Sequence, residues 1–355
     1  MQEKGFLKED TDFVKFFAVL MLLFHHAYLY NPYAESADIF YQPFSRAAVL
    51  EAAVLCRSCI LVFAMLSGYG LYVTYQRHCT AGSGSCWNFI GSRLIRMMKN
   101  YWLIYGLVTI LYLVVPSSGI SASAYGSWQA VLANATGTAF LFRLPLVCDP
   151  WWYMSFIIVF ILLVPAFAWL CDHGGILIFL GLFVLVSGNW MDSYLLDYYL
   201  SPLLAAFIGM LCARWKVFDF LHQRQIGGLK GKPLSLCKIA AVLLLGLLAV
   251  LLRQRGFLSR SIGTVLSFLM IVLLNELSGL IPPNGRTWIC RMGGWHSENM
   301  YLIHYFWLTT AAAPLIYSLH HFLLIIAAVY FLSWAASVLL NRGLKRLPSL
   351  KRISQ

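Results

Sequence analysis

Long apolar runs separated by short polar connections dominate this sequence. The stretch 118–146 is less hydrophobic and rich in Gly, Ser and Ala, which is compatible with an interfacial helix rather than a further span. The pattern predicts an all-α integral membrane protein with about ten transmembrane helices. We place these helices at approximately 13–30, 48–75, 101–116, 150–170, 175–190, 195–213, 237–252, 261–281, 299–317 and 320–341.

The distribution of charge divides the chain into a cytoplasmic N-terminal tail (1–12), a transmembrane domain (13–341) and a basic cytoplasmic C-terminal tail (342–355). Lys and Arg gather in the tails and in alternate connections, so the positive-inside rule places both termini in the cytoplasm. The first apolar run has no small-residue cleavage pattern, and we expect it to remain as the first span. Arg253, Arg255 and Arg260 depart from the rule; they form either an external anion site or a solvated turn.

The composition supports a membrane protein and excludes several other classes. Charged residues make up 11% of the chain and hydrophobic residues 60%, whereas soluble domains carry roughly 25% charged residues. The Lys and Arg residues that give the net charge of +12 lie between apolar runs. Binding to anionic lipid headgroups therefore explains this charge better than binding to nucleic acid. The scattered cysteines predict no disulfide framework and no metal site, and no nucleotide-binding glycine motif is present.

The first predicted span carries polar residues deep inside an apolar helix. Lys15 and His26 are separated by eleven residues, which at about 100° per residue places them on nearly the same face, roughly 16 Å apart. His25 points about 100° away from His26. A polar stripe inside hydrocarbon is costly and therefore indicates a functional site. The structural alternative is a histidine bonded to a carbonyl and a lysine that reaches the headgroups.

The second predicted span contains Arg57, which requires a partner or an aqueous cavity if it lies within the membrane. The same span contains Ser67-Gly68, small residues that permit the close approach of another helix. Later spans carry Glu276 and His304, each of which is by itself interpreted as a satisfied core residue. Trp151 and Trp152 fit an interfacial aromatic belt.

A basic stripe precedes the third predicted span. Arg93, Arg96 and Lys99 follow one another at intervals of three residues, which places them along one flank of a helix at the cytoplasmic surface. Arginine binds phosphate in a bidentate manner, so the stripe could hold an anionic ligand. Ordinary anchoring beside Trp102 is the alternative, and from these residues alone it is favoured.

Taken together, these motifs are more specific than any one of them. The chain resembles the type-3 membrane acyltransferase family, whose members move acyl groups onto sugars and other hydroxyl acceptors in bacterial envelopes. The resemblance rests on five motifs in order, from Lys15 to His26, Phe63 to Gly68, Arg93 to Trp102, Trp152 to Ser155 and Tyr301 to His304. The chain departs from the family pattern in three places: a lysine at position 15, a Phe-rich motif that is diluted, and no proline after the arginine pair.

The resemblance implies an acyl-CoA donor, acetyl-CoA by default, and a hydroxylated acceptor, a carbohydrate as the first candidate, at the bacterial inner membrane. We predict that His26 is the general base, because imidazole removes a hydroxyl proton near neutral pH. His25 is the second candidate. Lys15 would stabilise negative charge, and Arg57 would stabilise the thioester oxyanion or orient the imidazole.

We predict that Arg93, Arg96 and Lys99 hold the phosphates of the CoA donor. Covalent transfer through a histidine or serine stays open as an alternative route. An alternative from another class is a transporter or flippase that uses Lys15, His26 and Arg57 to pass a polar solute. The oligomeric state is open, a homo-oligomer included.

Overall fold

A computed structural model describes residues 6–29, 31–82, 84–115, 119–188, 191–225, 229, 231–255 and 259–346. The regular secondary structure of this part of the chain is helical, apart from a single β-bridge between Phe40 and His321. The predicted all-α class is therefore confirmed. The ends of the two predicted tails, residues 1–5 and 347–355, lie outside the described residues.

Seven helical segments within the described residues are long and apolar enough to cross a membrane. The predicted count of ten spans and the cytoplasmic placement of both termini are not confirmed by this number. The helix α1 (Lys8–Tyr28), which contains the polar stripe, is not among the seven. The seven are Arg46–Thr80, Cys86–Val114, Asp149–Ser187, Ser193–Arg214, Gly231–Gln254, Arg260–Leu280 and Phe322–Gly343.

The chain forms two compact units. The first comprises Met1–Ala18, Ser58–Ile90 and Val159–Gly294, and the second comprises Val19–Arg57, Gly91–Ile158 and Trp295–Gln355. Three long helices, α1, α5 (Cys86–Val114) and α7 (Trp152–Ser187), contribute to both units.

Two of the predicted spans contain a local irregularity. The spans expected at 150–170 and 175–190 are the two parts of α7, which a kink separates at Gly174, whose φ of −155° and ψ of 26° are not helical. Within the span expected at 48–75, α3 (Arg46–Cys56) ends and α4 (Cys59–Thr80) begins on either side of Arg57 and Ser58, and the two helices together form the apolar segment Arg46–Thr80.

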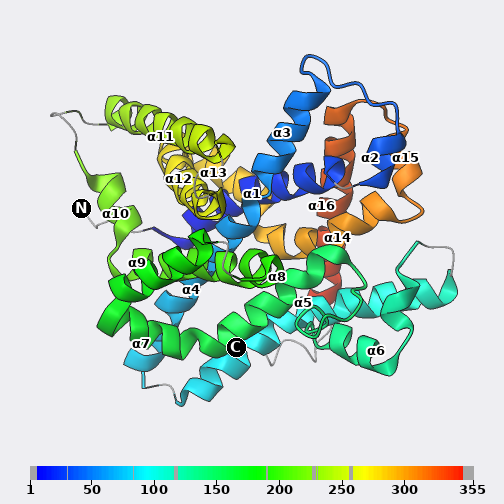
Figure 1. The fold of residues 1–355 in the computed structure, drawn as a ribbon, viewed down its shortest axis with the longest axis horizontal. Coiled ribbons are helices and arrows are strands. Elements are labelled where there is room, and N and C mark those ends of the chain that lie inside the picture. The colour runs from blue at the N-terminus through cyan, green and yellow to red at the C-terminus, as the bar shows by residue number, and fades with distance from the viewer. Residues whose placement is uncertain are drawn as a thin grey trace. The chain divides into compact units, whose positions relative to one another are not determined.

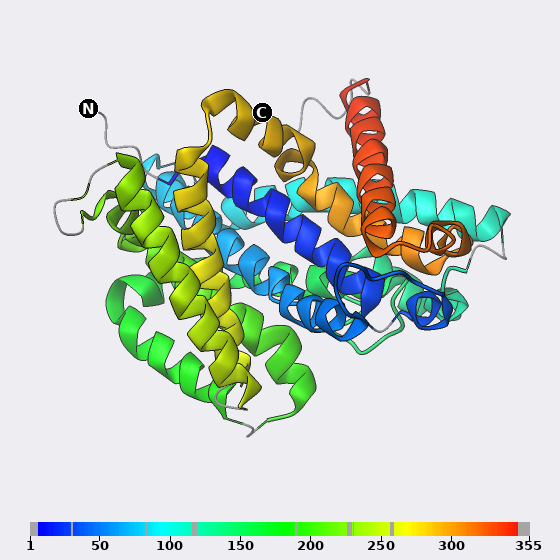
Figure 2. The same cartoon turned by 90° about the horizontal axis from the view of Figure 1, so that it is seen from above.

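The first unit also contains the helices between Ser193 and Met292. Figure 2 shows α11 and α12 packed side by side along their length. A short π-helical segment, Leu196–Leu200, leads directly into α9. The helices of this part are α8 (Ser193–Leu195), α9 (Ser201–Arg214), α10 (Val217–Gln223), α11 (Gly231–Gln254), α12 (Ser259–Leu280) and α13 (Pro283–Met292).

Helices α4 and α9 approach each other so closely that their backbones touch (Figure 1). A Cβ added at Gly68 would overlap the carbonyl of Ala206, and a Cβ added at Gly209 would overlap that of Met65. The close approach expected at Ser67-Gly68 is confirmed. Small residues allow such contacts where apolar burial alone gives no preference for one helix neighbour over lipid.

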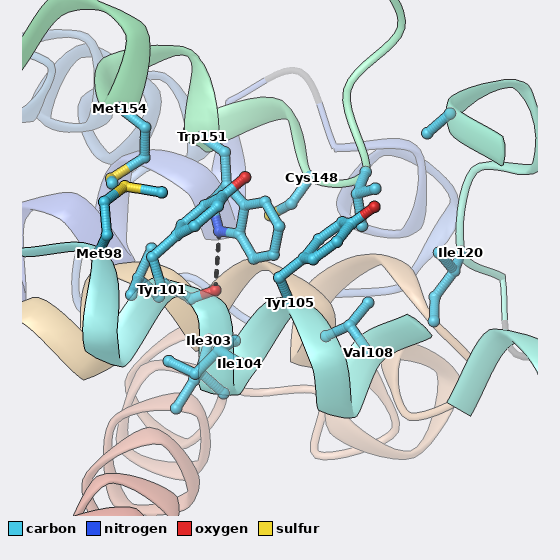
Figure 3. Close-up of a cluster of buried hydrophobic side chains, with 13 residues drawn as sticks. Met98, Tyr101, Ile104, Tyr105, Val108, Ile120, Cys148, Trp151, Met154 and Ile303 are labelled. Atoms are coloured by element: carbon cyan, nitrogen blue, oxygen red, sulfur yellow. Dashed lines mark hydrogen bonds between the residues drawn. The ribbon is translucent and has the colours of Figure 1, made fainter. Parts of the chain in front are cut away.

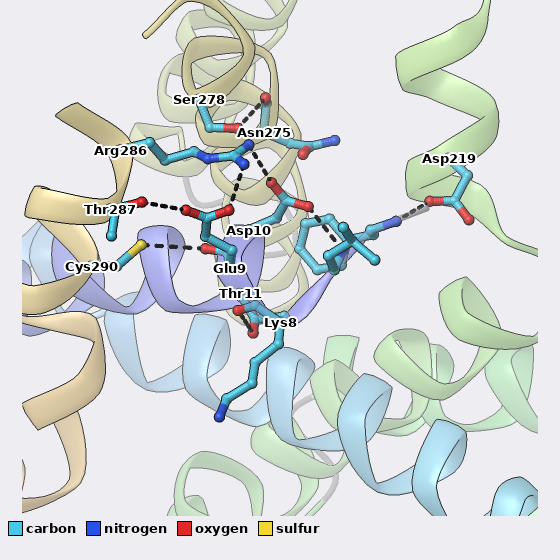
Figure 4. A network of polar contacts seen from close by, with 12 residues as sticks. Lys8, Glu9, Asp10, Thr11, Asp219, Asn275, Ser278, Arg286, Thr287 and Cys290 are labelled. Atoms are coloured by element: carbon cyan, nitrogen blue, oxygen red, sulfur yellow. Dashed lines mark hydrogen bonds and ion pairs between the residues drawn. The ribbon is translucent and has the colours of Figure 1, made fainter. Parts of the chain in front are cut away.

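A polar network ties the start of α1 to α13 within the first unit (Figure 4). The Arg286 guanidinium lies 2.5 Å from Glu9 Oε2 and 3.3 Å from Asp10 Oδ1. The thiol of Cys290 donates to the Glu9 carbonyl. Burial raises the pKa of this thiol to about 11, so it stays protonated and able to donate near neutral pH.

Two charged residues whose roles the sequence left open are also paired within the first unit. Arg260 Nε donates to Asp197 Oδ1 at 2.7 Å. Glu276 is 1% exposed, and its Oε1 lies 3.2 Å from His222 Nδ1 and 3.5 Å from Lys238 Nζ. Opposite charges offset part of the cost of burying this carboxylate.

The second unit is built around α3, α5, α14 and α16. Short helices connect these elements and cover their ends. The additional elements are α2 (Pro32–Ser36), η2 (Ala122–Tyr125), α6 (Trp128–Ala135), η3 (Asp149–Trp151), η5 (Gly294–His296), of which Gly294 belongs to the first unit, α14 (Ser297–Thr309), α15 (Ala313–Tyr317) and α16 (Phe322–Arg346).

An aromatic cluster forms the core of this unit (Figure 3). Trp151 is 1% exposed and its Nε1 donates to the Leu302 carbonyl at 3.0 Å. The centroid of the Tyr101 ring lies 4.9 Å from that of the Trp151 ring. The expectation that Trp151 belongs to an interfacial belt is therefore wrong. Its indole N–H finds a carbonyl on α14, which allows it to be buried.

The region that the sequence marked as less hydrophobic is organised by Asn134. The Asn134 Nδ2 group donates to the carbonyls of Ala130 and Pro145, both at 2.9 Å, and Oδ1 accepts from Val147 N–H at 3.1 Å. The Tyr101 hydroxyl donates to the Asn134 carbonyl. Its longest helix is α6, eight residues long, so no further span forms among the described residues of this region.

We expect Gly68→Ala to destabilise the protein, because the added methyl must separate α4 from α9. Overpacking of this kind typically costs about 1–3 kcal/mol. Gly70 offers a matched control on the same helix, because a Cβ built there meets no atom within 4 Å. Thermal melting in detergent should show a lower midpoint for Gly68→Ala and an unchanged or higher midpoint for Gly70→Ala. Equal midpoints would contradict the close contact.

Candidate functional site

Three ring side chains from α1 and α14 meet within the second unit. The centroid of the His26 ring lies 5.1 Å from that of His304 and 5.4 Å from that of Tyr305. His26 is half-buried. Neither nitrogen of the His26 ring forms a hydrogen bond with any described residue, so both are available to a ligand or to a neighbouring side chain.

His25 has a different environment, as its direction on the helix predicted. Its Nδ1 lies 2.9 Å from the Ala53 carbonyl of α3, and the residue is 6% exposed. A ring nitrogen beside a carbonyl oxygen carries the proton, because the oxygen can only accept. His25 thus anchors α1 to α3, while His26 stays unbonded.

His304 is fully buried, and only one of its two ring nitrogens has a hydrogen-bond partner. It is 0% exposed, and its Nδ1 lies 2.8 Å from the Tyr301 carbonyl and 3.2 Å from the Met300 carbonyl. Its Nε2 has no hydrogen-bond partner. The sequence interpretation of His304 as a satisfied core residue is therefore correct for one nitrogen and wrong for the other.

Two residues next to this group were not identified from the sequence. The Tyr305 hydroxyl donates to Asp149 Oδ2 at 3.2 Å, and Asp149 is exposed at the start of η3. Tyr305 directly follows His304 in the sequence, which was a usable signal. There was no such signal for Asp149, because this residue contacts Tyr305 of α14 from a position more than 150 residues earlier in the chain.

Arg57 lies at the end of α3 rather than within a continuous helix. It forms the C-terminal cap of α3, and its side chain is exposed. Its position four residues after Ala53 places it one helical turn beyond the carbonyl that holds His25. Arg57 lies within the apolar segment Arg46–Thr80, in agreement with the prediction, but the helix is interrupted where the charge occurs.

Lys15 belongs to the first unit, whereas both histidines of α1 belong to the second. Its Nζ lies 3.2 Å from Asp12 Oδ1, one turn earlier on the same helix. The Asp12 side chain is 6% exposed and the Lys15 side chain 32% exposed. The neighbouring carboxylate offsets the cost of placing the lysine in an apolar helix.

The basic stripe lies on α5 in the second unit. Arg93 and Lys99 are half-buried and Arg96 is exposed. The helix begins at Cys86, well before the span that the sequence placed at 101–116. The stripe and the spanning segment are therefore parts of one helix, and the predicted helical placement of the stripe is confirmed.

The described residues contain no group of three or more His, Cys, Asp or Glu side chains that could hold a metal ion. The nine cysteines are free. The chemistry that the arrangement around His26 can perform is proton transfer by imidazole, next to a hydroxyl and a carboxylate supplied by Tyr305 and Asp149.

Comparison with known proteins gives one match. The profile of the family described as Acyltransferase domain matches residues 9–342, nearly the whole chain. No curated protein and no solved structure matches the chain. A match of this extent, together with the apolar helices, shows that the chain belongs to the type-3 acyltransferase family of membrane proteins.

Proposed function

We propose that this protein transfers an acyl group, acetyl as the first candidate, from acyl-CoA to a hydroxyl of a carbohydrate acceptor of the bacterial cell envelope. Membership in the acyltransferase family supports the reaction class. We further propose that it acts in the bacterial inner membrane; the family and the apolar helices support a multi-pass membrane protein.

The observation that carries this proposal is the unbonded imidazole of His26. Of the two adjacent histidines, His25 is occupied by the Ala53 carbonyl, and His26 is not bonded to any described residue. A general base requires a free lone pair within reach of the proton that it removes. His26 meets this requirement, which is why we assign it the role of base.

The reaction follows from this assignment. His26 takes the proton of the acceptor hydroxyl as the oxygen attacks the thioester carbonyl, and the tetrahedral intermediate carries a negative charge on oxygen. The new C–O bond forms, the C–S bond breaks, and the proton leaves with the CoA thiolate. Positive charge near the oxyanion lowers the barrier; we assign this role to Arg57.

The donor requires a separate site for its phosphates. Arg93, Arg96 and Lys99 present three cations along α5, and the two guanidinium groups can bind phosphate in a bidentate manner. We propose that this stripe binds the CoA moiety. A transporter or flippase, the alternative function, would use the polar residues of α1 without any need for a CoA site.

Substitution His26→Ala should lower the rate of CoA release from acetyl-CoA by about 10²- to 10⁴-fold, the usual contribution of a general base. The assay uses purified protein in nanodiscs with a carbohydrate acceptor, and thermal melting confirms that the variant is folded. His25→Asn is the matched comparison, because the amide nitrogen of Asn can reproduce the Nδ1 bond to Ala53.

Loss of activity in His25→Asn together with retention in His26→Ala would assign the base to His25 and contradict our proposal. Retention in both variants would exclude both histidines of α1 as the base and contradict our proposal.

The double substitution Arg93→Ala/Arg96→Ala should weaken acyl-CoA binding by about tenfold or more, because each lost charged hydrogen bond contributes roughly 1.5–3 kcal/mol. Binding is measured by calorimetry with a non-hydrolysable acyl-CoA analogue. Arg342→Ala, an exposed arginine at the start of the predicted C-terminal tail, controls for the loss of charge alone.

If wild-type protein binds no acyl-CoA of any chain length, the acyltransferase proposal fails and the transporter becomes the better explanation. If Arg342→Ala weakens binding as much as the double variant, the donor is attracted by general charge and not by the α5 stripe.

A further inference from the structure

The two nitrogens of His304 are in opposite chemical states. Nδ1 faces two carbonyl oxygens of its own helix, those of Tyr301 and Met300, at 2.8 and 3.2 Å. Carbonyl oxygens only accept hydrogen bonds, so Nδ1 carries the ring proton. Nε2 is then an unprotonated acceptor, and it is buried without any partner.

An unpaired acceptor in a fully buried ring is costly, because it has given up water without gaining a hydrogen bond in the protein. The ring of His26 lies beside it, with its centroid 5.1 Å away and its plane inclined by 43°. Two imidazole rings at this separation are within reach of an N–H···N hydrogen bond after small rotations of their side chains.

Two other polar neighbours of His26 already use their ring or hydroxyl proton. The His25 Nδ1 is bonded to the Ala53 carbonyl, and the Tyr305 hydroxyl donates to Asp149. His304 differs from both because it is fully buried and its Nε2 has no hydrogen-bond partner. An N–H of His26 and the lone pair of this nitrogen are complementary.

We propose that His304 is a positioning residue whose Nε2 accepts the N–H of His26 and so holds His26 in the tautomer that a general base needs. This inference rests on the proposed role of His26. The two carbonyls of α14 fix the tautomer of His304. The bond from His26 to Nε2 of His304 then fixes the tautomer and the ring orientation of His26. The other nitrogen of His26 keeps its lone pair for the acceptor hydroxyl.

The bond also matters during proton transfer. When His26 takes the acceptor proton it becomes an imidazolium, and the N–H that points to His304 becomes a stronger donor. His304 Nε2 then stabilises the charged ring without taking the proton, which His26 returns to the CoA thiolate. An orienting partner behind a catalytic or metal-binding histidine is commonly worth about 10- to 100-fold.

The first test needs no enzymatic activity. Nitrogen-15 NMR of histidine-labelled protein in nanodiscs reports whether each ring nitrogen is protonated, and single substitutions assign the signals among the nine histidines of the chain. We expect Nδ1 protonated and Nε2 unprotonated for His304, and a hydrogen-bonded N–H for His26 that shifts in His304→Phe. A protonated Nε2 on His304, or His26 signals that do not move, would overturn the proposal.

The second test uses a matched pair of amides. The side chain of Gln can place its oxygen near the position of Nε2, whereas Asn reaches only that of Nδ1. His304→Gln should keep kcat within about tenfold of wild type, and His304→Asn and His304→Phe should lower it by about 10- to 100-fold. KM for acyl-CoA should be unchanged in all three.

A result in which His304→Gln is as inactive as His304→Phe, with both folded by thermal melting, would overturn the positioning role, because an amide can accept the N–H but cannot replace a base. If instead wild-type protein releases no CoA at all, the proposed function fails while the NMR result still decides the His26–His304 bond.

Discussion

A buried polar atom that has no water around it must find a hydrogen-bond partner in the protein, and this constraint accounts for much of the second unit. His25 is held by a carbonyl of α3, the Trp151 indole by a carbonyl of α14, and Asn134 by three backbone groups. His26 and His304 differ from these residues: neither ring nitrogen of His26 is bonded to a described residue, and the buried Nε2 of His304 has no hydrogen-bond partner. The chemistry proposed for His26 depends on these unused ring nitrogens.

The second unit positions this imidazole through elements that are far apart in the sequence. Helix α1 supplies the histidine, α3 fixes the adjacent one, and α14 brings His304 and Tyr305 to the same ring. Asp149, at the end of the region organised by Asn134, completes the group through Tyr305. Because three separate helices contribute, small changes in their packing alter the geometry around His26, even where no contact to the ring is lost.

Local sequence patterns predicted the features that depend on one helix or on residue size. Hydrophobic runs predicted the all-helical class, Ser67-Gly68 the close helix contact, and the 100° offset the different surroundings of His25 and His26. Tertiary contacts determine the features that the sequence did not predict: the helix break at Arg57, the burial of Trp151 and the rings that lie beside His26. Periodicity within α1 carries no information about α14, so His304 and Asp149 could not be assigned a role from the sequence.

The buried amide of Asn134 has a consequence for how this protein can be produced. Asn134-Ala135-Thr136 has the sequence of an N-glycosylation site, yet both hydrogens of the amide are used, one by Ala130 and one by Pro145. A glycan replaces one of these hydrogens and adds a bulky group at a residue that is 1% exposed. In a eukaryotic secretory pathway, sugar attachment to the nascent chain and folding of this region would exclude each other, whereas a bacterial host without that modification avoids the conflict.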